Sequence, residues 1–115
     1  MAWYTASVFL KGDHLSRPEV SPLWEEKLLL IQAASEEEAR QEAARMGKDS
    51  ECEYDVADGK SGHPPGRLRW NFQTVERVIS IESPQLVSGT EAFYRFLRDS
   101  EAISLLTPFS DTGES

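Results

Sequence analysis

The stretch "LWEEKLLLIQAASEEEARQEAARMG", residues 23–47, decides the fold because a strand pattern passes directly into a helix pattern. Leu28 to Ile31 is the most apolar run in the chain, and such a two-sided run is typical of a central strand, here over residues 23–34. Ser35 then stands as a helix N-cap, and Glu38 three residues later can accept from the backbone N–H of Ser35. We therefore predict a strand followed at once by a helix over residues 36–46.

The predicted helix has a narrow contact face and an acidic start. Ala39, Ala43 and Met46 fall on one side, so its backbone can lie close to a sheet, and Gly47 is expected to end it. Glutamates 36–38 point about 100° apart around a helix and do not converge on one ion. We interpret them as the favourable N-terminal charge of a helix rather than as a metal or catalytic site.

The other elements follow from period-two and helical patterns. Residues 3–11, 51–56 and 67–82 alternate as strands, and a change of parity near residues 73–76 predicts a bulge or a break into two strands. The segment "TEAFYRFLRD" places Phe93, Phe96 and Leu97 on one face behind Thr90, which predicts a second helix.

Together these elements predict an α+β fold with two layers. An antiparallel sheet of four or five strands, in the element order β-β-α-β-β-α, carries the helices on one face. Residues 1–106 are expected to form a single domain and residues 107–115 a flexible tail. The other sheet face, with some of Trp3, Phe9, Trp24 and Trp70, needs cover from the second helix, from a partner or from self-association.

Composition excludes several classes of function. The chain has 12 basic and 20 acidic residues, a net charge of −8, which argues against nucleic-acid binding and favours a basic protein partner or simple solubility. Cys52 is the one cysteine, so an internal disulfide is excluded and a reducing cytoplasm is expected. The N-terminal stretch lacks a basic leader, and no run approaches the ~20 apolar residues of a membrane span.

The familiar motifs of metal and nucleotide chemistry are missing. His14, His63 and Cys52 lack zinc-ligand spacing, and neither a Gly-x-Gly-x-x-Gly motif nor a complete phosphate-binding loop is present. We expect no metal and no cofactor. Cys52 and His63 could meet across a hairpin as a nucleophile pair, although a small buried thiol is the commoner use of such a cysteine.

Two further constellations stay open at this level. An acid/base pair could be drawn from four carboxylates, Glu25, Glu26, Asp55 and Glu76, with no spacing to support a choice. Trp70 and Phe72 stand beside Arg67 and Arg69, a patch that could stack a base or a ligand. Core packing of the two aromatic residues is the favoured interpretation.

The order of short motifs resembles that of a known family. The chain reads "WYTA", then "WEEKLLLIQAASEEEARQEAARMG", a tyrosine, a turn glycine, "RWNF" followed by a valine, and "GTEAFYRFL". Over residues 3–98 this resembles DUF4288, a family of small bacterial proteins with a domain of unknown function. The strand running into the Ser-Glu-Glu-Glu-Ala helix and the Trp-x-Phe strand are its most specific pieces. The resemblance implies a small α+β domain and carries over no activity or catalytic residue.

We expect a non-enzymatic protein-binding module, in its sharpest form a cytoplasmic immunity or antitoxin-like protein that neutralises a more basic partner. The alternatives are a small enzyme or ligand-binding domain that uses the 58–69 loop and the Trp70/Phe72 face, and a homodimeric scaffold. The acidic residues of the 51–56 strand share one face and lead into a long loop. The candidate partner-binding residues are therefore Glu51, Glu53, Asp55, Asp58, Lys60, His63 and Arg67.

Overall fold

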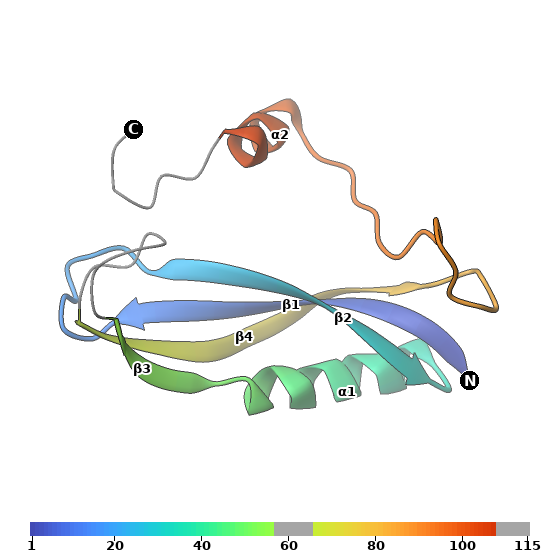
Figure 1. Ribbon diagram of the computed structural model, residues 1–115, viewed down its shortest axis with the longest axis horizontal. Coiled ribbons are helices and arrows are strands. Elements are labelled where there is room, and N and C mark those ends of the chain that lie inside the picture. Colours follow the sequence, from blue (N-terminus) through green and yellow to red (C-terminus); the bar gives the residue numbers. More distant parts are fainter. Residues whose placement is uncertain (57–65, 108–115) are drawn as a thin grey trace.

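One antiparallel sheet and one packed helix form the body of the protein. The computed structural model describes residues 1–56 and 66–107. Figure 1 shows a curled sheet with α1 along one side and α2 on the opposite side. The strands lie in the spatial order β2-β1-β4-β3, and every pairing is antiparallel. An α+β fold with an antiparallel sheet is thereby confirmed. The elements are β1 (Ala2–His14), β2 (Leu23–Ala33), α1 (Glu36–Asp49), β3 (Cys52–Val56), β4 (Gly66–Ser80) and α2 (Asp99–Leu106).

The start of α1 follows the predicted capping. Ser35 Oγ accepts from the backbone N–H of Glu38 at 3.1 Å, which confirms Ser35 as the N-cap. Glu38 Oε1 accepts from the backbone N–H of Ala34 at 3.3 Å, one residue earlier than predicted. The side chains of both residues thus satisfy backbone donors at the strand-to-helix junction.

Gly47 does not end α1, contrary to the prediction, because the helix continues to Asp49. The glycine is buried, and a Cβ built on it would lie 2.4 Å from Cδ1 of Phe72 and 3.0 Å from Cγ1 of Val8. Because glycine has no side chain, the helix can lie close to the sheet at this point.

The core lies between α1 and the facing side of the sheet. Ala39 and Ala43 are fully buried there, as the alanine face predicted. Trp70 is 8% exposed and its Nε1 donates to the hydroxyl of Tyr54 at 2.9 Å, so the core interpretation of this residue is confirmed. The sheet contributes Tyr4, Ala6, Val8, Leu10, Ile31, Ala33, Leu68, Trp70, Val75 and Val78.

The strand β2 is an edge strand, so the prediction of a central strand was wrong. The interior strands are β1 and β4, and in β1 Thr5 and Ser7 are buried along with Tyr4, Ala6, Val8 and Leu10. Leu28 and Leu30 alternate with the buried side of β2 and are about half exposed. An apolar run indicates that both faces can be buried, but it does not say what covers them.

The change of parity in β4 comes from irregular pairing with β1. Ser7 pairs with Arg77 while Val8 pairs with Val75, so Glu76 is an extra residue in β4. A second shift lies between Phe9 and Leu10. The predicted bulge near residues 73–76 is confirmed, and β4 continues through it as one strand.

The second helix differs from its prediction in place and in packing. Residues 91–98 are not helical, and Thr90 Oγ1 accepts from the backbone N–H of Val87 at 2.9 Å, which closes a turn before the segment instead of capping a helix after it. The helix α2 begins only at Asp99, and none of its residues is buried. Because α2 stands across the sheet from α1 (Figure 1), the expectation of both helices on one face was wrong.

Candidate interaction surface

The side of the sheet that faces away from α1 is called here the second face. In the register of β1 with β2, Thr5 lies opposite Leu30, Ser7 opposite Leu28, and Lys11 opposite Trp24. Trp24, Leu28 and Leu30 therefore share this face on the edge strand, and they are 53%, 51% and 50% exposed. We call these three residues the apolar strip. Exposed large apolar side chains gathered on one face are typical of an interaction site.

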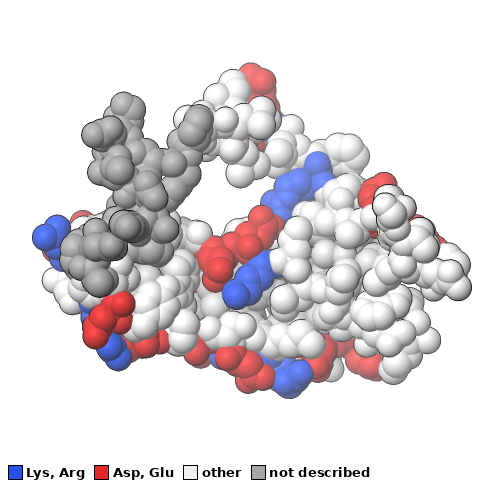
Figure 2. Space-filling model, viewed as in Figure 1, with Lys and Arg blue, Asp and Glu red and all other residues white. Residues whose placement is uncertain are grey.

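Residues 82–107, called here the C-terminal arm, are fixed to the second face by Arg95. Its Nη2 donates to Glu76 Oε1 at 3.2 Å and also to Glu26 Oε2. Ser7 Oγ donates to the same Glu26 oxygen at 2.6 Å. Figure 2 shows charged side chains of both signs in a line across the middle of the view, with uncharged surface on both sides. We call these contacts of Arg95 with Glu26 and Glu76 the anchor. The Arg95 side chain is 27% exposed, so solvent screens these ion pairs less than fully exposed ones and they contribute more stability.

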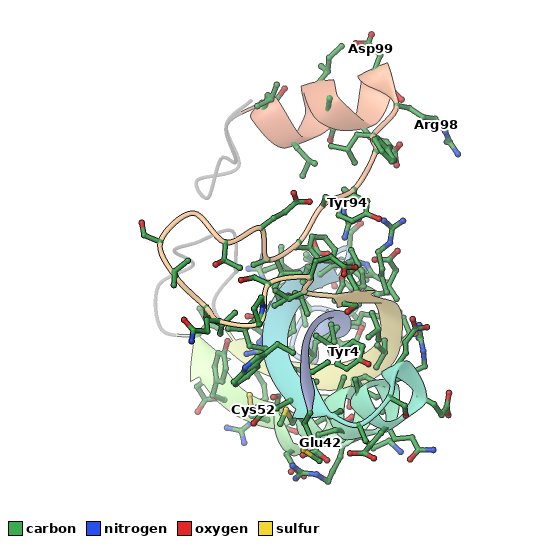
Figure 3. All side chains as sticks on the ribbon, turned by 90° about the vertical axis from the view of Figure 1, so that its right-hand side faces the viewer. Tyr4, Glu42, Cys52, Tyr94, Arg98 and Asp99 are labelled. Atoms are coloured by element: carbon green, nitrogen blue, oxygen red, sulfur yellow. The ribbon has the colours of Figure 1, made fainter. Side chains whose placement is uncertain are left out.

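Beyond this anchor the arm leaves the sheet. Figure 3 shows Tyr94 on the side of the sheet away from Tyr4 and α1, with α2 further out from Asp99 onward. Phe96 is 91% exposed. In α2 the large apolar side chains are also exposed, and they are Ile103, Leu105 and Leu106. A helix with uncovered apolar residues gains no stability from packing within this chain.

A small pocket lies where the arm leaves β4. Its volume is about 280 Å³, and it is lined by Ile79, Ser80, Glu82, Ser83, Thr90, Glu91, Phe93 and Tyr94. Ligand pockets usually span ~300–1,000 Å³ and hold convergent polar groups. This pocket lies just below that range.

The predicted acidic row begins at Glu51, directly before β3, and continues on β3 with Glu53 and Asp55; arginines of β4 balance much of its charge. Glu53 accepts from Nε of Arg67 at 2.6 Å and from Nε of Arg69 at 3.0 Å. These hydrogen bonds, that of Arg67 first, lower the pKa of Glu53, and the same contact raises the pKa of Arg67. Asp55 also pairs with Arg67 at 3.2 Å, and Glu51 accepts from the backbone N–H of Phe72 at 2.9 Å.

The remaining predicted site residues divide into two groups. Asp58, Lys60 and His63 lie outside the described residues, while Arg67 is exposed on β4. Cys52 is exposed, so the expectation of a buried thiol was wrong. It lies at the short edge strand β3, where α1 does not cover it.

The structure also places the candidate acid/base carboxylates and the Trp70/Phe72 patch. The second face brings Glu26 and Glu76 together, but Arg95 bridges them as a structural cation. Trp70 is buried, and Phe72 is partly buried with its ring beside Gly47, so both rings contribute to the core. Among the described residues, no group of three or more His, Cys, Asp or Glu side chains is placed to hold a metal ion.

Sequence reasoning missed the arm and its anchor. Arg95 is the only cation in the apolar segment "FYRFL", and a lone charge in such a segment is a usable signal for a specific ion pair. Its partners were not predictable, because Glu26 and Glu76 come from strands far apart in sequence.

In the part of the chain that the structure describes, neither helix is both long and apolar enough to cross a membrane.

Comparisons with known proteins identify the family. A search of the curated proteins and a search of the solved structures each found no match. The family resemblance seen in the motifs is confirmed by a scan against family models. The model described as Domain of unknown function (DUF4288) matches residues 3–94, most of the 115-residue chain, and the chain therefore belongs to this family.

Proposed function

We propose that this chain is a non-enzymatic protein-binding module that holds its partner with the second face and the C-terminal arm. One observation carries the proposal. Large apolar side chains are exposed on the edge strand β2 and along the arm, while the opposite sheet face is closed by α1. Burial of such side chains is the main source of free energy in protein association.

The sharper form of the proposal is a cytoplasmic, immunity or antitoxin-like bacterial protein that neutralises a more basic partner. The net charge of −8 supports it, because an acidic protein attracts a basic one at long range. The β3 row contributes less to this attraction than its sequence suggests, since Arg67 and Arg69 offset Glu53 and Asp55.

The test compares capture of proteins from a bacterial extract by the wild-type chain, by Leu28→Glu and by Gln41→Glu, followed by binding of the purified partner. Gln41 is exposed on α1, so its variant is the charge-matched control. We expect Leu28→Glu to weaken binding of the purified partner by about 30-fold or more, as a central apolar contact does. The control should bind like wild type. Equal affinities for all three chains would contradict the proposal.

The salt dependence of the association rate tests the electrostatic part of the proposal. If long-range attraction steers association, the on-rate should fall as salt rises from low to physiological ionic strength. Charge reversal of Glu51, Glu53 and Asp55 to Lys changes the net charge from −8 to about −2, so it should flatten this dependence. An on-rate that does not change with salt would remove the basic-partner form while leaving the apolar interface in place.

A further inference from the structure

We propose that the second face and the C-terminal arm bind a second copy of this chain, with α2 of each copy packed on the apolar strip of the other. The inference rests on the proposed function, because it takes the same surface as the binding surface and names its occupant. It goes further by assigning the two halves of the surface to each other.

One chain carries two exposed apolar surfaces that suit each other, a sheet strip and a helix. The strip on β2 is a shallow sheet surface, and α2 is a helix with no buried residue. A helix on a sheet face is a standard packing layer, as α1 on the other face shows. In a two-fold dimer each copy supplies one strip and one helix, so both kinds of surface are buried twice.

The contacts of Arg95 also place α2 where a second copy can reach it. Arg95 ties the arm to Glu26 of β2, in the middle of the strip, and Phe96–Arg98 then lead away from the face into α2. In Figure 2 open space lies beneath α2. The arm is thus held at its base and presents α2 outward, the arrangement needed to reach another copy.

The exposed apolar area also suits a dimer. The strip and the arm beyond Arg95 expose on the order of 700 Å² per copy, at about 100 Å² for each large side chain that is half exposed or more. A standard interface takes ~600–1,000 Å² from each partner, and the exposed apolar surface falls within this range. The surface is therefore large enough for a stable dimer. Its side chains are Trp24, Leu28, Leu30, Phe96, Ile103, Leu105 and Leu106.

Charges favour packing of faces over pairing of strand edges. Glu25, Glu26 and Lys27 lie in the middle of β2, and charges on an edge strand oppose its pairing with another edge. Lys11 Nζ lies 5.9 Å from the Trp24 ring centroid at one end of the strip. The first turn of α2 carries Asp99 and Glu101, which offer Lys11 the opposite charge and so favour one orientation.

The first experiment measures mass by light scattering after gel filtration, and the dissociation constant by sedimentation, for the wild-type chain and three variants. We expect a wild-type dimer at micromolar concentration. Leu28→Glu and Leu105→Glu, one in each half of the interface, should each weaken it by about 30-fold or more. Gln41→Glu should leave it unchanged. A wild-type chain that stays monomeric at 100-fold higher concentration would overturn the inference.

The second experiment tests which surfaces meet. In a Cys52→Ser background, a chain with Leu28→Cys is mixed with a differently tagged chain that carries Leu105→Cys, and the mixture is oxidised. We expect a disulfide that joins the two differently tagged chains, because α2 of one copy lies on the apolar strip of the other. Each chain has one cysteine, so this product identifies the two positions that meet. A mixture in which Gln41→Cys replaces Leu28→Cys should give at least 10-fold less product. Equal yields in both mixtures would reject the assignment of α2 to the strip.

These outcomes separate the inference from the proposed function. A monomeric wild-type chain whose Leu28→Glu variant still loses the purified partner would refute the second copy and keep the binding surface. In another outcome, the dimer forms as described while the purified partner binds Leu28→Glu and wild type equally. That result would support dimerisation through this surface and would show that the partner binds elsewhere.

Discussion

Gly47 lies against the Phe72 ring, and this contact decides how closely α1 packs on the sheet. Substitution by alanine in a helix interior normally adds about 1 kcal/mol of stability. Here the new Cβ would lie 2.4 Å from a ring carbon of Phe72, and overpacking of this kind costs ~1–3 kcal/mol. Since Phe72 is fixed on β4 and packs against the core beside Gly47, the clash outweighs the gain in helix propensity.

We therefore expect Gly47→Ala to lower the free energy of unfolding by about 1–2 kcal/mol in urea titrations. Gln41→Ala, on the exposed side of α1, is the control and should be neutral or slightly stabilising. Adding Phe72→Leu to Gly47→Ala should recover part of the loss. A Gly47→Ala protein more stable than the parent would show that the helix can move away from the sheet at no cost.

Thr5 carries the one buried side-chain polar atom without a hydrogen-bond partner among the described residues. It is 2% exposed, and its Oγ1 lies in the central strand β1. An unsatisfied buried hydroxyl costs ~1–3 kcal/mol, whereas an apolar group of similar shape does not. Thr5→Val should raise the free energy of unfolding by about 1 kcal/mol. Thr74→Val, at an exposed site on β4, should change it by less than about 0.5 kcal/mol. A loss of stability in Thr5→Val would mean that the hydroxyl is satisfied in solution.

At the scale of single residues, the sequence predicted local chemistry well. Ser35 was identifiable as a cap because its hydrogen bond to the N–H of Glu38 depends only on neighbours in the chain. The role of Gly47 was not, because the ring that fills its space comes from β4. Long-range contacts of this kind leave no local pattern.

At the scale of elements, β3 is held to β4 by charge as well as by backbone pairing. Glu53 bonds to Arg67 and Arg69, and its pKa is lower in the folded chain than its ordinary value. A carboxylate with a lowered folded pKa stabilises the fold above its unfolded pKa, and this contribution disappears as the pH falls through the folded value. The pH window therefore lies on the acid side of the ordinary glutamate range.

We expect wild-type stability to fall between neutral pH and about pH 3, and the fall to be smaller in Glu53→Gln. Urea midpoints of unfolding across that range would measure the difference. Glu36→Gln, an exposed glutamate in the first turn of α1, is the control for removing a carboxylate. An acid-side fall identical in Glu53→Gln and wild type would show that solvent screens the pair fully.

Some features of the strands and helices were predictable from the sequence pattern, and others were not. The alternation of β1 and the bulge of β4 were predictable, because period-two patterns report which side chains share a face, whereas the alternation of β3 is not matched by its burial. The place of β2 at the edge was not, since Leu28 and Leu30 look the same whether a neighbour covers them or not. The pattern of Phe93, Phe96 and Leu97 fits a helix, yet the segment that carries the Arg95 ion pairs has no regular secondary structure.

At the scale of the whole molecule, the body and the arm differ in how they are stabilised. The body is a sheet closed on one face by α1, with a continuous buried core. The arm has the Arg95 anchor and α2, which buries nothing in the single chain. Amides in such a segment open at little cost in free energy unless another surface covers them.

Hydrogen exchange followed by mass spectrometry therefore tests the arrangement of the whole molecule. In a monomer, amides of Asp99–Leu106 should exchange nearly as fast as in an unfolded peptide, because an exposed helix of 8 residues is marginal in water. As the protein concentration rises through the dissociation constant, their exchange should slow about 10-fold or more, while exchange in β1 stays unchanged. In Leu28→Glu the α2 amides should stay fast at every concentration, although the mutation lies in β2. Protection of α2 that is independent of concentration would mean that the helix folds back onto its own sheet, and it would place the apolar strip beneath its own arm.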